Sequence, residues 1–301
     1  KRIAAWVGLV IWVGIWGTGC VPLKPREDEN LKFLGEFFED GLHPVWGSGV
    51  IYLISGEERS VIGIDTATRQ IFTVYTLPLG FGKIGSDMDI SPELSTLVFP
   101  AEDSSGHVWL FLIDTLRGIS AGLKDSIYVG LAQYCRGCRP RFSINGDSIF
   151  FVGGEDGSKL LVWDLISDIV DTVMEAPGFF QDLLPQDTGF VYGKNPFKTY
   201  SFNTGLGGEL PNTEGWDYIE VNPIYRDCAV CWKGDTVILL YDLLDLTGKT
   251  KAVSPYINNG GILELSWSPD GRSIVFICEV VHSEPPVGYE LWIYRSITDF
   301  F

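Results

Sequence analysis

The chain has 301 residues, with 39 acidic and 22 basic side chains and a net charge of −17. Hydrophobic residues make up 46% of it, which excludes a disordered acidic tail because there is enough apolar material for a core. The excess of acid argues against nucleic acid as a partner, since an anionic surface repels phosphate.

The first segment reads as a targeting signal. Lys1 and Arg2 precede an uncharged run from Ile3 to Gly19, and small residues lead to Cys20 before a polar stretch. The end of the run resembles a bacterial lipobox, in which the cysteine is acylated after cleavage, although Gly17 stands where an aliphatic residue is usual. We expect a signal peptide over residues 1–19, lipidation at Cys20 and a tether over 20–30. The alternatives are an uncleaved membrane anchor or ordinary secretion. All three predict an extracytoplasmic protein, and the first predicts membrane anchoring in the periplasm or at the cell surface of a bacterium.

A repeated pair of strands fills the remainder. The clearest copy is LELSWSPDGRSIVFI (Leu263–Ile277), in which an alternating strand enters a Ser-Pro-Asp-Gly turn and a second apolar strand leaves it. Taking the residue before the proline, or its equivalent, as an anchor gives spacings of 38 to 52 residues, the length of a four-stranded propeller blade. A third strand also repeats and usually ends in Asp, as in LLVWDL and VILLYDL. The six anchors are His43, Ser91, Ser143, Leu184, Asn222 and Ser268.

These motifs resemble the WD-like β-propeller repeats of TolB. The resemblance covers about residues 40 to 301 and rests on WSPDGRSIVFI followed by ELWIY, with IDT or YDL closing other third strands. It implies an all-β fold, a six-bladed propeller of four-stranded blades, over residues 31–301. TolB carries an additional α/β domain before its propeller, and we expect this chain to lack it. The resemblance further implies a scaffold of the cell envelope, without naming its partner.

The last repeat ends soon after its third strand. We expect the segment LKFLGEFFED, from Leu31 to Asp40, to supply the missing strand and so to close the final blade. The alternative is that Leu31 to Phe38 is a surface linker.

Positions two residues before the anchors are predicted to face a central channel, because the positions one residue before them are all apolar and a strand alternates its faces. Such a ring is able to bind a cation or a basic peptide group; the alternative is a solvated channel whose charges pair with one another. The charged candidates at these positions are Asp89, Arg141, Asp182 and Glu220, with Gly41 and Ser266 completing the ring.

Loops on one face of the propeller form a second candidate site. Binding residues concentrate on loops held by a rigid scaffold, and Trp216 would supply an aromatic anchor, as would Tyr218. The alternative is ordinary charged surface. The candidates are Asp87, Glu102, Asp103, Glu155, Asp156, Trp216 and Asp217.

Two C-x2-C pairs in the sequence have the spacing of zinc ligands. Cys228 and Cys231 lie in a predicted strand, where residues three apart point to opposite faces and do not easily share one ion. Cys135 and Cys138 flank a glycine turn, so a local disulfide is the preferred interpretation in an oxidising compartment. We predict no metal and no cofactor.

Catalytic signatures are missing from the sequence: there is no G-x-S-x-G elbow, P-loop or H-E-x-x-H. We therefore predict a non-enzymatic, monomeric scaffold that binds a protein or peptide, with a membrane contact made only through the lipid anchor. The acidic charge of the chain favours a basic partner. The alternative is a glycan-active enzyme, or a propeller that binds a small ligand or cation in its acidic channel.

Overall fold

Side-chain hydrogen bonds hold the turns that begin at the anchor serines. The protein is described by a computed structural model over residues 29–37, 43–54, 58–85, 87–115, 122–131, 138–175, 178–225, 227–234, 236–253, 261–280 and 288–297. The hydroxyl of Ser91 accepts the N–H of Thr96 at 3.0 Å, and that of Ser268 accepts the N–H of Ser273 at 2.9 Å. Gly271 adopts a φ of +66°, which favours glycine at this point of the turn.

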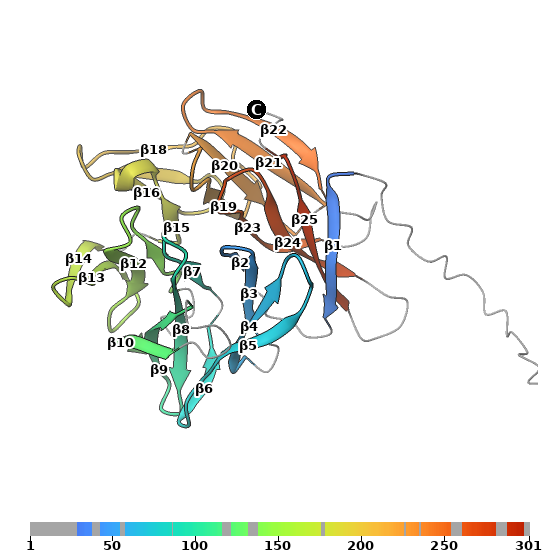
Figure 1. Cartoon of the computed structure of the whole chain (residues 1–301). Helices are drawn as coiled ribbons and strands as arrows, with labels where there is room; N and C mark the ends of the chain where they lie inside the picture. Colours follow the sequence, from blue (N-terminus) through green and yellow to red (C-terminus); the bar gives the residue numbers. More distant parts are fainter. Residues whose placement is uncertain are drawn as a thin grey trace, which may run out of the picture.

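Six antiparallel sheets follow one another around a centre at which their inner strands converge (Figure 1). The sheet of blade 1 contains β2 (Val45–Trp46), β3 (Val50–Ile54), β4 (Ser60–Asp65) and β5 (Ile71–Thr76). The sheet of blade 2 contains β6 (Phe81–Ile84) and β7 (Asp89–Ile90), β8 (Thr96–Asp103), β9 (His107–Asp114) and β10 (Gly122–Leu131). The sheet of blade 3 contains β11 (Arg141–Phe142), β12 (Ser148–Gly153), β13 (Lys159–Asp164) and β14 (Ile169–Glu175).

Sheets 4 to 6 have the same order from inner to outer strand. The sheet of blade 4 contains β15 (Phe180–Leu183), β16 (Gly189–Tyr192), β17 (Lys198–Ser201) and β18 (Gly207–Glu209). The sheet of blade 5 contains β19 (Tyr218–Val221), β20 (Cys228–Trp232), β21 (Val237–Asp242) and β22 (Thr247–Ala252). The sheet of blade 6 contains β23 (Ile262–Trp267), β24 (Ile274–Val280), β25 (Gly288–Tyr294) and β1 (Leu31–Phe37). A short 3-10 turn, η1 (Pro185–Asp187), follows β15. The predicted all-β, six-bladed propeller is confirmed.

The N-terminal strand closes the ring as predicted. β1 pairs antiparallel with β25, with Leu31 opposite Tyr294 and Phe37 opposite Tyr289 (Figure 1). The outer strand of the last blade therefore comes from the opposite end of the propeller sequence. Backbone hydrogen bonds tie the first and last segments of the ring together.

The hydrophobic core lies between the blades. Each of six buried clusters joins two neighbouring sheets, so that every blade packs on both of its faces. Third strands end in an aspartate that caps the following turn: the Asp164 carboxylate accepts the N–H groups of Ile166 and Ser167, and Asp242 does the same for Leu244 and Asp245. The repeated Asp of the third strands thus has a structural role.

Two faces of the propeller can be distinguished by their connections. The turns from inner to second strand and those from third to outer strand share one side, here named the turn face. Backbone hydrogen bonds join the two kinds of turn, for example from Leu165 N–H to the Asp147 carbonyl and from Leu243 N–H to the Asp227 carbonyl. The opposite side, which holds the second-to-third connections and the links between blades, is named the loop face.

The first anchor differs from its prediction. The hydrogen bond that starts each inner turn runs in blade 1 from Gly47 to Val50, four residues later than the expected anchor His43. A two-glycine turn, Gly47-Ser48-Gly49, replaces the Ser-Pro turn, and Gly49 has a φ of +75°. The position two before this anchor is Val45, whereas the predicted Gly41 lies outside the described residues.

No helix within the described ranges is long and apolar enough to span a membrane.

Candidate functional site

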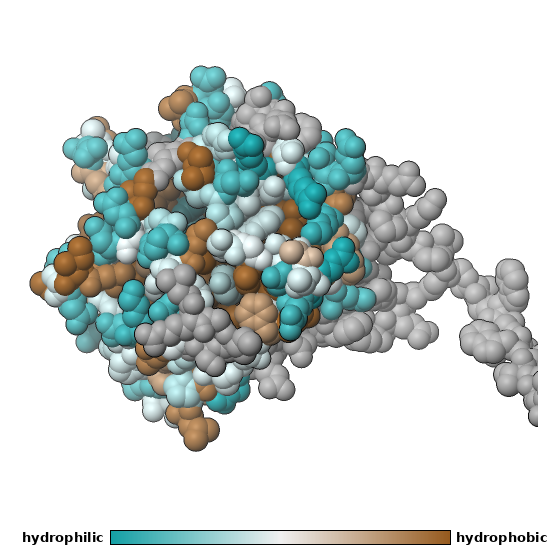
Figure 2. Space-filling model, viewed as in Figure 1, coloured by the Kyte–Doolittle hydropathy of each residue, from teal (hydrophilic) through white to brown (hydrophobic). Residues whose placement is uncertain are grey.

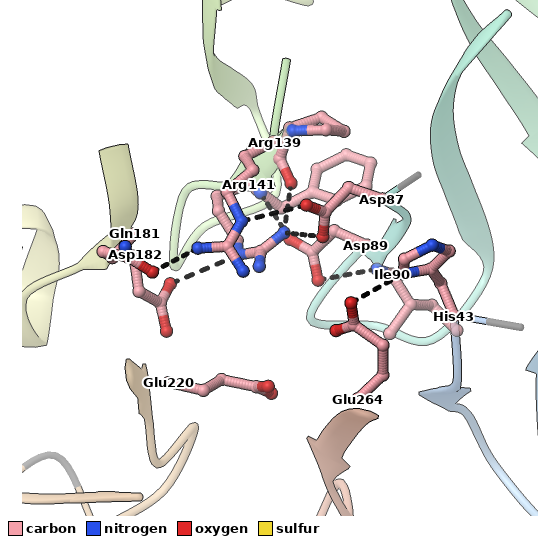
Figure 3. Close-up of polar contacts among 12 residues, drawn as sticks. His43, Asp87, Asp89, Ile90, Arg139, Arg141, Gln181, Asp182, Glu220 and Glu264 are labelled. Carbon is pink, nitrogen blue, oxygen red and sulfur yellow. Dashed lines mark hydrogen bonds and ion pairs between the residues drawn. The ribbon is translucent and has the colours of Figure 1, made fainter. Parts of the chain in front are cut away.

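The ring predicted from the inner strands does surround a cavity. Its volume is about 330 Å³, and residues from all six blades line it. Asp89 of β7, Arg141 of β11, Asp182 of β15 and Glu220 of β19 all contribute side chains, and Figure 3 shows them converging on one space. Ser266 and Val45 complete this level of the channel.

A second charged level lies two residues earlier in the sequence of the same blades, and the sequence analysis missed most of it. It holds His43, Asp87, Arg139 and Glu264 (Figure 3). Asp87 was predicted as a loop residue, but it lies in the break between β6 and β7 and points at the arginines. Extending the strand alternation by one further step would have found this level. It would not have found Gln181, which a bulge between Phe180 and Asp182 turns towards Arg139.

Ion pairs join blades 2, 3 and 4 across the channel. Arg139 Nε lies 2.9 Å from Asp87 Oδ2, and Arg141 Nη1 lies 3.5 Å from Asp87 Oδ1. Arg141 Nε also lies 3.6 Å from Asp182 Oδ1, and Arg139 donates a hydrogen bond to Gln181 Oε1. These side chains are largely removed from solvent, so each pair is held by its neighbours as well as by its own charge.

The acids of the ring also bind backbone amides of the next blade. Asp89 Oδ2 accepts the Phe142 N–H at 2.7 Å, Asp182 Oδ2 accepts the Val221 N–H at 2.7 Å, and Glu220 Oε1 accepts the N–H of Trp267 at 3.2 Å. An inner strand has no neighbour on its axial side, so a carboxylate supplies the missing acceptor. Part of the acidic ring therefore holds adjacent blades together.

Burial changes the protonation of these groups. Desolvation raises the pKa of Asp89 to about 6 although Arg141 opposes it, and raises the pKa of Glu220 to about 8. Desolvation also raises the pKa of Asp182. Asp87 is different: burial works to raise its pKa, but the adjacent Arg139 and Arg141 outweigh burial and lower it. At neutral pH the channel thus contains a carboxylic acid at Glu220 beside ionised carboxylates.

His43 and Glu264 bridge the first and last blades. His43 Nδ1 lies 3.4 Å from Glu264 Oε1 (Figure 3). Burial disfavours the charged imidazole, yet the hydrogen bond and charge of Glu264 outweigh burial and raise the pKa of His43. The sequence analysis had placed this histidine in no site.

The loop candidates do not form one group. Asp103 Oδ1 accepts the N–H groups of Ser105 and His107, and Asp156 Oδ1 accepts that of Ser158, so both aspartates hold turns. Glu102 and Asp103 are the last residues of β8 and not loop residues. Glu155 and Asp217 are exposed.

Trp216 is not an exposed anchor, because only 9% of it is accessible. It packs with Phe197 and Leu210, and Lys233 Nζ lies 5.1 Å from its ring centre. Thr213 turns the preceding loop inward: its hydroxyl donates to the Leu210 carbonyl at 2.6 Å and accepts the Phe197 N–H at 3.1 Å.

Cysteines contribute to the core in the described part of the chain. Cys228 packs between blades 5 and 6 and Cys231 between blades 4 and 5, so the two point to opposite sides of β20 as predicted. Burial raises the pKa of the Cys228 thiol to about 12. Cys138 is buried, while its expected disulfide partner Cys135, like the lipidation residue Cys20, lies outside the described residues. Within those residues no group of three His, Cys, Asp or Glu side chains is arranged to hold a metal ion.

Comparisons with known proteins agree with the fold. No family model and no curated protein matches the sequence. Among solved structures, a TolB-type protein from Agrobacterium tumefaciens is similar, with a TM-score of 0.55 and 15% identity over 85% of this chain and 90% of that one. At this identity the likeness concerns the fold, and it agrees with the blade motifs from which it was first inferred: the protein has a TolB-like six-bladed β-propeller.

Proposed function

We propose that this protein is a non-enzymatic, extracytoplasmic scaffold of the bacterial cell envelope that binds a segment of a protein partner in its central channel. The observation that carries the proposal is the cavity of about 330 Å³ on the axis, to which all six blades contribute. A concave site with a few convergent polar groups of perturbed pKa is the usual form of a binding site.

The acids of the ring support a binding role better than catalysis. Asp89 and Asp182 each bind two backbone N–H groups, one from their own strand and one from the next blade. Such bonds fix the two carboxylates in place and occupy the oxygens that a catalytic acid or base would use. The cavity between the inner strands still has room for an inserted side chain.

A peptide display library tests the proposal with the full chain. Peptides selected on the wild-type protein are expected to bind at least tenfold more weakly to Ser266→Phe, which fills the cavity, and to bind normally to Ser105→Phe on the loop face. Glu264→Arg provides a second channel variant if Ser266→Phe does not fold, as judged by circular dichroism. Selected peptides that bind both channel variants normally would overturn the proposal.

The envelope location and the lipid anchor are proposed from residues 1–30. Mass spectrometry of the N-terminal fragment of the membrane-bound protein should show a diacylglyceryl group on Cys20, and Cys20→Ser should release the protein from the membrane fraction. An unmodified Cys20 in the membrane fraction would disprove the anchor without affecting the channel proposal.

A further inference from the structure

The two sides of the channel carry different charges. Arg139 and Arg141 both come from blade 3, and Asp87, Asp182 and Gln181 bind them. The other side, built by blades 5, 6 and 1, presents Glu220 and Glu264. Among the described residues that line the cavity, the only basic side chain on that side is His43, which contacts Glu264.

Glu220 lies at the cavity with little compensation for its charge. One of its oxygens accepts the Trp267 N–H, and the described residues give it no ion pair. In Figure 3 the carboxyl groups of Glu220 and Glu264 extend from neighbouring strands into the same space, opposite the arginines. Burial outweighs the attraction of Arg141 and keeps the proton on Glu220, with a pKa of about 8. A cation placed beside it would favour the ionised form and release this proton.

The mouth of the cavity on the turn face is mainly apolar. Ile224 is 57% exposed there and also lines the cavity. Further apolar side chains stand at the tips of neighbouring turns on this face, with Ile166 82% and Leu244 76% exposed. Figure 2 shows one side of the molecule, on which separate apolar patches interrupt a mainly hydrophilic surface. The residues of this face that line the cavity are mainly apolar, namely Pro92, Leu94, Ile144, Leu184, Ile224 and Pro269, with the acidic Asp187 among them.

We propose that the channel accepts a single lysine or arginine side chain flanked by apolar residues, which enters from the turn face and places its charge between Glu220 and Glu264. This inference rests on the proposed function and specifies the chemistry of the segment that is bound. An apolar mouth above an acidic floor matches an apolar segment with one cation, and it repels an acidic one.

Other charged groups near Glu220 favour a cationic ligand over an anionic one. Arg141 of β11 attracts its charge, while Asp89 of β7 and Asp182 of β15 repel it. Glu264 of β23 and His43, just before β2, face the same cavity, and Asp87 and Arg139 lie at the level of His43. The arginines are bound by aspartates, so an additional anion would meet the carboxyl groups of Glu220 and Glu264 on the opposite side. An additional cation would meet Glu220, which has no ion pair among the described residues, and Glu264, whose only ion pair there is with His43.

The test uses three amidated, acetylated pentapeptides, Gly-Leu-X-Leu-Gly, in which X is lysine, arginine or norleucine. Their affinities for the full chain are measured by calorimetry at pH 7 in phosphate and in Tris. The lysine or arginine peptide should bind about tenfold or more tightly than the norleucine peptide, which resembles lysine without its charge. Binding should also release a proton, seen as a difference in heat between the two buffers.

Variants identify the site. Glu220→Gln and Glu264→Gln should each weaken the cationic peptide about tenfold and leave the norleucine peptide unchanged. Ile224→Ser should weaken all three peptides, whereas the matched control Leu79→Ser, on the loop face and 98% exposed in the native protein, should weaken none. Equal binding of the norleucine peptide, or unchanged binding of the cationic one by the glutamine variants, would overturn the inference. If library peptides that depend on the channel carry no basic residue, the inference fails while the proposed function stands.

Discussion

The arginine side and the glutamate side of the channel are built on the same plan but differ in charge. Acids two residues before the anchors bind the next blade's backbone on both sides, as Asp182 does with Val221 and Glu220 does with Trp267. On the arginine side the carboxylates are also paired with cations. On the other side Glu220 has a backbone bond but no ion pair among the described residues. Buried acids of the same ring therefore differ in whether a cation compensates their charge.

The largest effect is expected at Arg141. Arg141→Met should lower the free energy of unfolding at pH 8 by about 3–5 kcal/mol, because the buried Asp89 then loses its cation and Asp182 keeps only the weaker attraction of Arg139. Urea denaturation measures the change. The control Arg69→Met, at an exposed turn residue, should alter stability by no more than about 0.5 kcal/mol. Similar losses for both variants would show that the arginine is not the centre of this side.

Replacing Glu220 is expected to raise the free energy of unfolding, whereas replacing Arg141 is expected to lower it. Its raised pKa means that the protonated acid stabilises the fold below the unfolded pKa of 4.5, and that this contribution is lost as the pH rises through about 8. Glu220→Gln mimics the protonated acid at every pH. It should increase the free energy of unfolding at pH 9 by on the order of 3 kcal/mol and change it little at pH 4. A loss of stability at pH 9 would contradict the comparison.

The same type of substitution on the arginine side should destabilise. Asp182 accepts the N–H groups of Leu183 and Val221 through different oxygens, at 2.8 and 2.7 Å. Asp182→Asn retains one acceptor and leaves one of these two N–H groups without a partner, so we expect a loss of about 2 kcal/mol in urea denaturation at pH 7. If both Asp182→Asn and Glu220→Gln stabilise the protein, the two sides of the channel do not differ.

The smallest effect concerns the His43–Glu264 contact between the first and last blades. Because the pKa of His43 is raised, its contribution to stability is complete below pH 6.5 and is lost as the pH rises through the folded pKa. His43→Gln should cost up to about 1 kcal/mol at pH 5.5 and almost nothing at pH 9. With three histidines in the chain, NMR titration can follow His43 directly, and Glu264→Gln should lower its pKa. An unchanged titration would show that the pair does not form in solution.

The fold was largely predictable because several blades repeat the same turn chemistry. Serine anchors and capping aspartates act over a few residues, so the sequence shows them directly. Blade 1 was misaligned because His43-Pro44 imitates the Ser-Pro start of a turn, whereas the actual turn uses Gly47 and Gly49.

The channel was predictable only to its first level. Strand alternation correctly placed Asp89, Arg141, Asp182 and Glu220 around one space, but their pairing depends on distances between blades that no single strand encodes. The bulge at Gln181 interrupts the alternation, so the contact of Gln181 with Arg139 could not be derived. Trp216 was misplaced because a hydroxyl bond of Thr213 folds its loop inward.

The pairing of β1 with β25 has a consequence for biosynthesis. About 250 residues separate the two strands, and β1 leaves the ribosome first. At a synthesis rate of 5–20 residues per second, β1 waits roughly 10 to 50 seconds for its neighbour. During that time Leu34, which is buried in the finished sheet, lacks the residues of blade 6 that complete its hydrophobic cluster, among them Leu291 and Ile293. A nascent chain held at any point before β25 should therefore be much more sensitive to protease at residues 31–37 than the completed protein.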